Sequence, residues 1–312
     1  MKIIFWGSSE LCIPLLEKIK EGFQLLAVVT AIDKPQGRHL KILPGPVKQW
    51  AQNNNINVLQ PEKLSGNEIL YTELKSLQPD FFVVLSYGKV IPEKYLQIPR
   101  IAPLNIHPSL LPKFRGPAPL EWALISGEKE TGISVILMDK NIDTGRILTQ
   151  VKIKIDDDDD IFTLRKKISG LLFNCLIDAI EKVSKGYKGE EQKGPASYAP
   201  KLKKEDGKID WNENVISIHN KIRGLADWPG AYTFLIYPKG KKMIKIIKST
   251  LFSLEDSCLK PGTFVDLKRK ILVACGKGIL CIERIQEEGR KIQTAIEYLN
   301  GHFKILKDGY FQ

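Results

Sequence analysis

The first part of the chain alternates short apolar runs with segments whose apolar residues recur at helical spacing. Runs of this kind predict buried strands, and the periodic segments predict amphipathic helices. The predicted strands are at 2–7, 25–30, 81–88 and 101–107, and the predicted helices at 9–19, 46–53 and 67–77. Strands that alternate with helices favour a mostly parallel sheet covered on both faces. We therefore expect a Rossmann-like α/β fold for this part.

Two further strands and a long helix complete this predicted domain. Residues 131–138 are apolar, residues 146–155 alternate in the manner of an antiparallel strand, and residues 161–184 have helical spacing. The acidic run Asp156–Asp160 precedes the helix. We interpret it as a solvated turn that places negative charge at the helix N-terminus, and not as a metal site.

The remainder of the chain has a different pattern. Residues 186–206 are rich in Gly, Pro and Lys, which is typical of an interdomain linker. Beyond one helical segment at 215–225, several short strand patterns follow at close spacing between 231 and 286. This predicts a small OB-like β-barrel. The predicted organisation is an α/β domain at 1–188, a linker at 189–206 and a β-barrel domain at 207–312.

One polar feature interrupts the apolar pattern of the α/β part. The run at 101–107 ends in Asn105 and His107, two positions apart, so both side chains lie on the same face of an extended backbone. Five prolines and glycines between 108 and 119 then exclude regular structure. This pattern is typical of an active-site rim, although an ordinary strand end with a surface histidine fits the stretch by itself.

Asp143 supplies a third polar side chain, in a turn just after the strand at 131–138. Because groups that follow neighbouring parallel strands converge in one crevice, we expect Asp143 to lie near Asn105 and His107. No Ser in a G-x-S-x-G elbow and no Cys near the His offers a nucleophile. The trio therefore suits acyl or formyl transfer between two bound substrates. Asn105 and a protonated His107 would stabilise the oxyanion, and Asp143 would orient the imidazole and accept a proton.

Composition narrows the class of protein. The five cysteines among 312 residues are scattered and form no C-x-x-C pair, which indicates a reducing compartment and no zinc site. No apolar run reaches the roughly 20 residues of a membrane span, so we expect a cytoplasmic protein. The first turn, GSSE, lacks the G-x-G-x-x-G spacing of a dinucleotide site, and GKG at 276–278 is no phosphate loop. We expect neither nicotinamide nor ATP as a cofactor.

Charge is unevenly distributed along the chain. The formal net charge is +11; residues 1–188 carry 25 Lys+Arg against 21 Asp+Glu, whereas residues 207–312 carry 18 against 11. A small and strongly basic domain suggests a polyanionic partner, with nucleic acid as the first candidate. The alternative is a solvated basic surface that reflects a lysine-rich proteome.

Three runs resemble the folate-dependent formyltransferases: SYGKVIP at 86–92, NIHPSLLPKFRGPAPLEWAL at 105–124 and TGISVILMDKNIDTG at 131–145. RGPAP-x-x-WAL followed by G-E-x-x-TG is similar to the branch of the family that acts on methionyl initiator tRNA. The likeness extends over nearly the whole chain, through the basic loop at 31–46, SYAPKL at 197–202 and KIDW at 208–211. Pro108, where relatives often carry glycine, is a mild departure, and both residue types suit a turn.

The resemblance implies a role for each matching residue. Asn105, His107 and Asp143 would be catalytic, and no metal would take part. The folate contacts would be Ser109, Leu110, Leu111, Pro112, Ser86, Tyr87 and Gly88. Arg38, which follows Gly37, would engage the acceptor end of the tRNA, with Lys34 and Lys41 on the same loop.

The implied reaction moves the formyl group of 10-formyltetrahydrofolate to the α-amino group of methionine on the initiator tRNA. We expect a monomer that binds the tRNA acceptor stem. The alternatives are a formyltransferase for a sugar nucleotide or purine precursor, a formyltetrahydrofolate hydrolase, and a nucleic-acid-binding protein with an inactive Rossmann-like domain.

Overall fold

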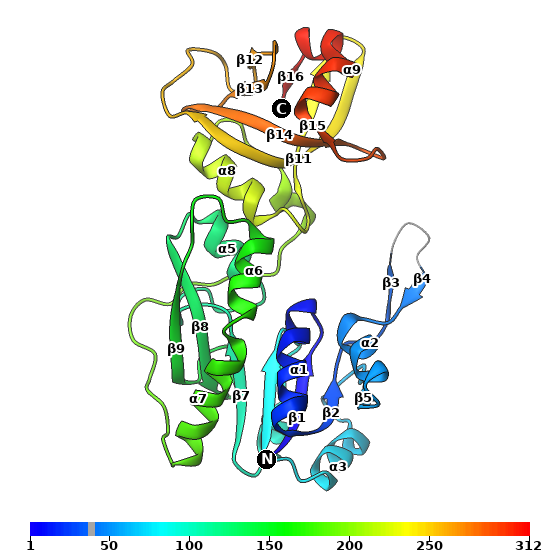
Figure 1. The fold of residues 1–312 in the computed structure, drawn as a ribbon, viewed down its shortest axis with the longest axis vertical. Coiled ribbons are helices and arrows are strands. Elements are labelled where there is room, and N and C mark those ends of the chain that lie inside the picture. The colour runs from blue at the N-terminus through cyan, green and yellow to red at the C-terminus, as the bar shows by residue number, and fades with distance from the viewer. Residues whose placement is uncertain (37–40) are drawn as a thin grey trace. The chain divides into compact units, whose positions relative to one another are not determined.

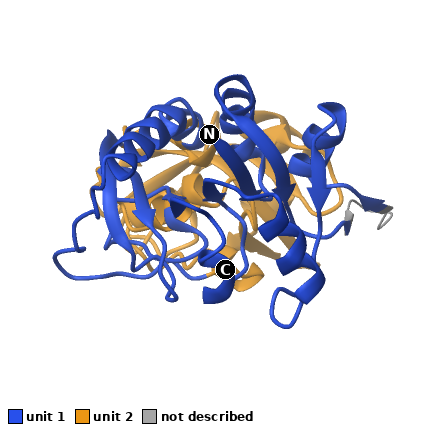
Figure 2. Cartoon of the chain, turned by 90° about the horizontal axis from the view of Figure 1, so that it is seen from below, with its two compact units in different colours: residues 1–119, 130–154, 165–200 blue, residues 120–129, 155–164, 201–312 orange. Residues whose placement is uncertain are grey.

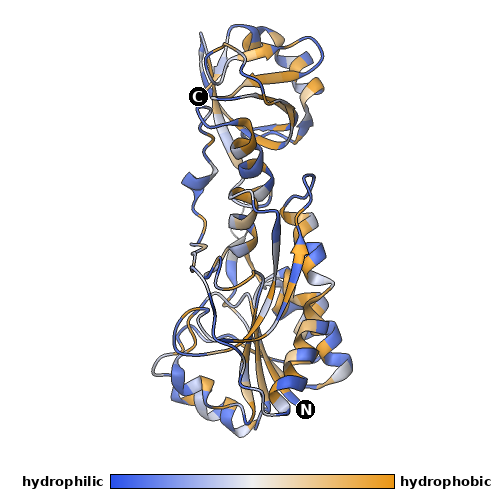
Figure 3. Cartoon of the chain, turned by 90° about the vertical axis from the view of Figure 1, so that its left-hand side faces the viewer, coloured by the Kyte–Doolittle hydropathy of each residue, from blue (hydrophilic) through white to orange (hydrophobic). Residues whose placement is uncertain are grey.

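The apolar runs near the N-terminus form the centre of a seven-stranded sheet with the order β5-β2-β1-β6-β7-β8-β9 (Figure 1). Strand β1 (Lys2–Gly7) lies between β2 (Gln24–Val29) and β6 (Phe81–Leu85) and is parallel to both. Every residue of β6 is buried, as expected for a strand covered on both faces. In Figure 3 the strands of this sheet are mainly orange, the colour of apolar residues. The predicted Rossmann-like architecture is confirmed.

Helices and the outer strands complete this part of the fold in the computed structural model, which describes residues 1–36 and 41–312. The remaining strands are β5 (Asn57–Leu59), β7 (Ala102–His107), β8 (Glu130–Leu137) and β9 (Arg146–Lys154). The helices are η1 (Glu10–Cys12), α1 (Ile13–Gly22), α2 (Pro46–Asn53), α3 (Glu68–Ser76), α4 (Glu93–Leu96), α5 (Pro119–Ile125), α6 (Ile161–Ser169) and α7 (Leu172–Ser184). The Asn67 side chain caps α3 by accepting a hydrogen bond from the backbone N–H of Leu70.

Two details differ from the sequence prediction. Strand β8 is antiparallel to β7, and β9 is antiparallel to β8, so the sheet is parallel only as far as β7. The helix predicted at 161–184 is two helices, α6 and α7, separated at Gly170 and Leu171. Gly170 stands at this break, where its greater backbone freedom disfavours a continuous helix.

The predicted loop at 31–46 contains two short strands. Strand β3 (Lys34–Gln36) pairs with β4 (Lys41–Leu43) in antiparallel orientation. Prolines and glycines in this stretch predicted a loop, and each strand has only three residues.

Gly7, the glycine of the first turn, has a packing role. A Cβ atom at this position would lie 2.6 Å from the Leu85 carbonyl oxygen of β6. The close approach of two strand ends therefore accounts for this glycine.

The second sheet is antiparallel and has the order β12-β13-β14-β11-β10-β16, with β15 paired to β14. Its strands are β10 (Ala231–Tyr237), β11 (Gly240–Ser253), β12 (Phe264–Asp266), β13 (Ile271–Ala274), β14 (Ile279–Glu287), β15 (Gln293–Thr294) and β16 (Tyr310–Phe311). The accompanying helices are η2 (Lys204–Gly207), α8 (Val215–Gly224) and α9 (Ala295–Lys307). Trp211 stacks on Phe311 in the core, with ring centroids 5.5 Å apart. The predicted OB-like β-barrel is confirmed.

The chain forms two compact units, shown in Figure 2. Unit 1 comprises residues 1–119, 130–154 and 165–200, and unit 2 comprises residues 120–129, 155–164 and 201–312. The predicted boundaries, with a linker at 189–206, stay predictions.

The acidic run before α6 is partly a solvated turn and partly a buried contact. Asp160 caps α6 by accepting the backbone N–H groups of Phe162 and Thr163 at 2.9 Å, as its position suggested. Asp159 is buried, however, and the Arg223 guanidinium of α8 donates to the carbonyl oxygens of Asp156 and Asp159. The interpretation as a simple solvated turn was therefore wrong for Asp159, because a buried arginine holds this backbone.

Candidate active site

Strand β7 carries Asn105 and His107 on one face, while Leu104 and Ile106 are buried on the other. His107 is only 4% exposed, so its imidazole is almost wholly enclosed by protein. The strand therefore presents an amide and a buried imidazole to the same surface of the sheet, as the spacing of the two residues predicts.

Asp143 lies against both of these side chains. Its Oδ1 accepts a hydrogen bond from Asn105 Nδ2 at 2.9 Å, and its Oδ2 lies 3.6 Å from His107 Nδ1. The backbone N–H of Gly116 also donates to Oδ2, at 2.8 Å. The structure thus brings the three predicted catalytic residues together.

The route by which Asp143 reaches the site differs from the expected one. We expected neighbouring parallel strands to end at one edge, but β8 is antiparallel to β7, and Leu137 at its end lies opposite Leu104. The loop at 138–145 must therefore fold back over the face that carries Asn105 and His107. Asp143 turns this loop with a positive φ of 53°, a left-handed conformation that is unfavourable for a residue with a Cβ.

The second ring nitrogen of His107 fixes its tautomer. His107 Nε2 lies 2.9 Å from the carbonyl oxygen of Phe114. Because a carbonyl oxygen can only accept, Nε2 carries the proton, and Nδ1 faces Asp143 either bare or as part of a charged ring. Phe114 itself has a φ of 59°, which helps to direct this carbonyl at the imidazole.

The loop between His107 and α5 is held by side-chain hydrogen bonds at its base. Ser134 Oγ donates to the Ser109 carbonyl at 2.7 Å and accepts from the Leu111 N–H at 3.1 Å. The Ser109 hydroxyl donates to the carbonyl of Lys113 at 2.7 Å. Ser109 and Leu111, both predicted folate contacts, are buried and shape the loop with these bonds.

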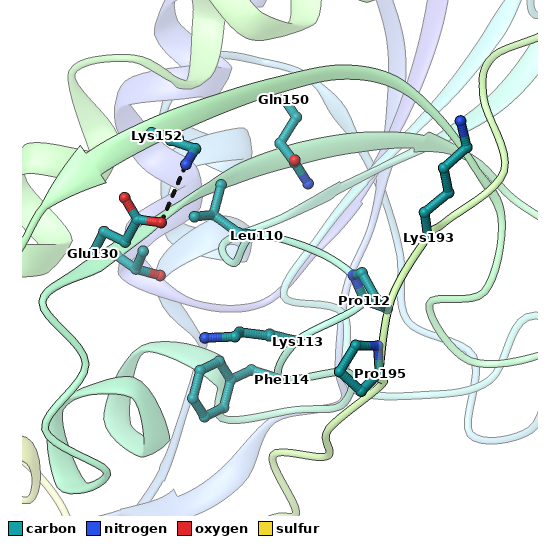
Figure 4. Close-up of a pocket in the computed structure, with 10 residues that line it drawn as sticks. Leu110, Pro112, Lys113, Phe114, Glu130, Gln150, Lys152, Lys193 and Pro195 are labelled. Carbon is teal, nitrogen blue, oxygen red and sulfur yellow. Dashed lines mark hydrogen bonds and ion pairs between the residues drawn. The ribbon is translucent and has the colours of Figure 1, made fainter.

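The other two predicted contacts from this loop, Leu110 and Pro112, line a cavity of about 250 Å³ (Figure 4). The cavity is also lined by Gln150 of β9 and by Lys193. Asn105, His107 and Asp143 do not line it. The loop therefore contacts the catalytic candidates through its backbone, at Phe114 and Gly116. Its Leu110 and Pro112 side chains border the cavity instead.

The segment after β6 contributes the remaining predicted folate contacts. Ser86 and Gly88 are exposed and have positive φ angles of 52° and 77°. Tyr87 is buried beside Trp6, with ring centroids 5.2 Å apart, and burial raises the pKa of its phenol. Any contact between this segment and a ligand would therefore involve Ser86, Gly88 or the backbone, and not the Tyr87 ring.

The predicted tRNA contacts lie at β3 and β4. Lys34 begins β3 and is exposed, and Lys41 begins β4. Arg38 lies outside the residues that the structure describes.

Sequence reasoning missed several groups that contact the trio. They are the Phe114 carbonyl, the Gly116 N–H and the Gln192 side chain, which donates to the backbone carbonyls of Asp143 and Gly145 at 2.8 and 2.9 Å. The first two are backbone groups, which nearly every residue type has, so the sequence does not reveal them. Gln192 lies in a stretch rich in Gly, Pro and Lys, where nothing distinguished it from linker residues.

Two absences among the described residues bear on other kinds of site. Within 1–36 and 41–312, no three His, Cys, Asp or Glu side chains gather in a way that could hold a metal ion. Among the same residues, no helix combines the length and apolar character needed to cross a membrane.

Comparison with known proteins gives two matching families, one for each part of the chain. Residues 1–180 match the formyl transferase family, and residues 201–303 match the formyl transferase C-terminal domain. A relative from Caldanaerobacter subterraneus subsp. tengcongensis, named methionyl-tRNA formyltransferase, is 43% identical over 97% of either chain.

Solved structures show the same fold at lower identity. The methionyl-tRNA formyltransferase of Clostridium thermocellum is 21% identical, with a TM-score of 0.55 over 81% of this chain and 94% of that one. HypX from Aquifex aeolicus, solved with tetrahydrofolic acid, is 18% identical with a TM-score of 0.63. The match covers 97% of this chain and 47% of HypX, so this chain spans about half of the length of HypX.

Proposed function

The chain belongs to the formyl transferase family, and we propose that it transfers the formyl group of 10-formyltetrahydrofolate to the α-amino group of methionine on the initiator tRNA. The contact of the Asp143 carboxylate with both Asn105 and His107 carries this proposal on the structural side. The relative at 43% identity, which is named for this activity, supports the choice of acceptor.

The reaction forms one bond and breaks another at the formyl carbon. The methionine amine attacks this carbon, the carbonyl oxygen becomes an oxyanion, and the bond to the folate nitrogen then breaks. The amine must lose a proton, and the departing nitrogen must gain one. The enzyme's task is therefore to place two substrates, to stabilise negative charge on oxygen and to move a proton.

Each member of the trio suits one of these tasks. Asn105 Nδ2 gives one hydrogen to Asp143 and retains a second, which can stabilise the oxyanion. His107 holds Nε2–H on the Phe114 carbonyl, so Nδ1 is the ring atom that can give or take a proton. Asp143 lies beside this nitrogen and can stabilise the charged imidazole or accept the proton that the amine loses.

Two exposed apolar side chains, one after the predicted folate segment and one next to Asp143, suit a flat co-substrate. Val90, which follows the predicted folate segment, is 62% exposed, and Ile142, next to Asp143, is 57% exposed. Apolar surface of this kind can pack against the ring system of a folate. We propose that Ser86, Gly88 and the turn at 138–145 receive the pterin.

The tRNA is proposed to meet two features of the chain. Lys34, Arg38 and Lys41 would engage the unpaired acceptor end, and the excess of basic residues in 207–312 would attract the acceptor stem. A-form RNA is recognised mainly through its backbone and shape, so exposed cations on a β-domain suffice for this contact. The monomeric state and the cytoplasmic location stay predictions.

Labelled 10-formyltetrahydrofolate, supplied with charged initiator and elongator tRNAs, tests the function. We expect label to appear on methionine attached to the initiator tRNA. Release of labelled formate without formylated tRNA would instead indicate a hydrolase, and formylation of an amino sugar or a purine precursor would indicate one of the other transferases.

A further inference from the structure

The stretch at 190–199 belongs to unit 1 and is hydrogen-bonded to other parts of it, although its composition is typical of a linker. The backbone groups of Glu190 and Ile147 exchange two hydrogen bonds, of 2.7 and 2.9 Å. Farther along, Arg115 N–H donates to the Ser197 carbonyl at 2.9 Å, and Ala199 N–H donates to the Arg115 carbonyl at 2.7 Å. These bonds anchor the stretch beside the loop that contacts the catalytic candidates.

Gln192 is the residue of this stretch that reaches the Asp143 turn. Its Nε2 donates to the backbone carbonyls of Asp143 and Gly145, at 2.8 and 2.9 Å. Its Oε1 accepts from Arg115 Nη2 at 2.6 Å and from Nε at 3.2 Å. The amide thus donates both of its hydrogens to the turn, and its oxygen accepts from Arg115. Only one orientation of the amide allows all of these hydrogen bonds.

Hydrogen bonds, including those that the Asp139 carboxylate accepts within it, hold the turn at 138–145. Asp143 has a left-handed φ of 53°, and its neighbours Asn141 and Ile142 are exposed, so packing contributes little to holding the turn. The carboxylate is fixed by Asn105 and by the Gly116 N–H. Gln192 fixes the backbone carbonyl of the same residue.

The same stretch also supports the carbonyl that sets the His107 tautomer. Ser197 Oγ accepts the backbone N–H of Phe114 at 2.9 Å, and the Phe114 carbonyl accepts His107 Nε2–H. Of the two residues that would move protons, Asp143 therefore contacts 190–199 directly, and His107 is linked to it through Phe114.

We propose that Gln192 is a positioning residue for formyl transfer, which holds the Asp143 carboxylate at Asn105 and His107 by anchoring the turn. The inference rests on the proposed function, because it assigns Gln192 a role in that reaction. Gln192 is not proposed to touch the reacting atoms. It acts through Asp143, so its loss lowers the rate of the chemical step and leaves substrate binding nearly intact.

Three variants of the full-length protein test the proposal: Gln192→Ala, Gln192→Glu and, as a matched control, Glu191→Ala. Glu191 is the exposed neighbour and has a weak ion pair with Arg146 at 3.5 Å. We expect Gln192→Ala to lower kcat roughly 10- to 100-fold, the cost of displacing a reacting group by about 1 Å. The KM values for tRNA and folate should stay within about threefold of wild type, and Glu191→Ala should stay within about twofold in kcat.

Gln192→Glu separates anchoring from general stability. Its carboxylate still accepts from Arg115, which supports folding, but it has no hydrogen to donate to the Asp143 and Gly145 carbonyls. We expect a loss in kcat as large as that of Gln192→Ala, and this variant serves if Gln192→Ala fails to fold.

Two results would overturn the proposal while wild type is active: a kcat within twofold of wild type for Gln192→Glu, or a lowered melting temperature of the Gln192 variants with unchanged kcat. An inactive wild type would instead contradict the proposed function.

Discussion

The two units use their polar residues in different ways. In unit 1, the Asp143 carboxylate contacts Asn105, His107 and the Gly116 N–H, and His107 is held in one tautomer by Phe114. In unit 2, basic side chains such as Lys239 and Lys241 are exposed, and its segment 207–312 carries 18 Lys+Arg against 11 Asp+Glu. We infer that the first arrangement depends on exact geometry, whereas the second depends on the amount of charge and tolerates change in any single residue.

The largest expected effect is that of Asp143→Ala. Removing the carboxylate leaves His107 Nδ1 without its partner and the amine without a proton acceptor, so we expect kcat/KM to fall about 1,000-fold. The affinity for charged initiator tRNA should stay within about threefold, which is measured by equilibrium binding. Glu191→Ala, which removes an exposed carboxylate from the same unit, is the control and should retain nearly full activity. If Asp143→Ala lowered the tRNA affinity as much as kcat/KM, the proposed difference between the two units would be contradicted.

The double variant Lys239→Ala/Lys241→Ala is expected to have a smaller effect, which falls on tRNA binding and not on the rate. These exposed lysines lie at the β10–β11 hairpin, where Lys241 lies over the Phe234 ring at 5.1 Å. We expect roughly tenfold weaker tRNA binding, and a slope of log affinity against log salt that is reduced by about 1 for each phosphate that the variant no longer neutralises. The kcat at saturating tRNA should change less than twofold.

The matched control for this double variant is Lys63→Ala/Lys75→Ala in unit 1. It removes the same charge, and Lys75 also lies over an aromatic ring, that of Tyr71. Similar losses of tRNA affinity in both double variants would show that net charge alone, and not unit 2, attracts the tRNA.

Substitution of Gly116 tests the loop between His107 and α5 without changing a catalytic side chain. Its φ is 118°, and an added Cβ would lie 2.7 Å from the Ala199 carbonyl oxygen. Gly186 has a φ of 87° but open space around it, so Gly186→Ala reports the backbone cost by itself, about 1–2 kcal/mol.

We expect Gly116→Ala to cost about 1–3 kcal/mol more in the free energy of unfolding than Gly186→Ala, because of the added steric conflict. Only Gly116→Ala should also lower kcat, since the Gly116 N–H holds Asp143. Urea denaturation and steady-state kinetics measure the two effects. Equal stability of the two variants would contradict the close contact with Ala199.

The smallest effect concerns the pH dependence of stability in unit 2. Burial, followed by the charge of nearby Arg223, lowers the pKa of His219, and Asp157 and Glu283 oppose this shift. The Nδ1 atom of His219 lies 3.0 Å from the Ser249 hydroxyl. The unfolded chain therefore binds a proton at higher pH than the folded chain. As pH falls below the ordinary histidine value of about 6.5, the unfolded state gains protons first and stability is lost.

We expect the melting temperature of wild type to fall more between pH 7.5 and pH 5.5 than that of His219→Gln. The same fall in both proteins would show that His219 does not contribute.

Local patterns predicted most of the fold and part of the site. The apolar runs of β1, β2 and β6 and the two-residue spacing of Asn105 and His107 are properties of adjacent residues, so they can be recognised in the sequence. The antiparallel direction of β8 could not be predicted, because an apolar strand has the same pattern in either direction. We therefore expected Asp143 at the site for the wrong reason.

The contacts that hold Asn105, His107 and Asp143 in place could not be predicted, because they join residues that are distant in the sequence. Gln192 lies 49 residues from Asp143, and the Phe114 carbonyl is a backbone group that any residue could supply. The break between α6 and α7 shows the same limit on a smaller scale, since apolar spacing continues through Gly170 while the helix does not.

The most direct test of the central claim is single-turnover formyl transfer by His107→Ala, with the enzyme in excess over charged initiator tRNA and with 10-formyltetrahydrofolate saturating. This measurement isolates the chemical step from binding and product release. We predict a rate constant at least about 100-fold below that of wild type, with tRNA affinity within threefold. A near-normal rate constant for His107→Ala would contradict the assignment of the catalytic site.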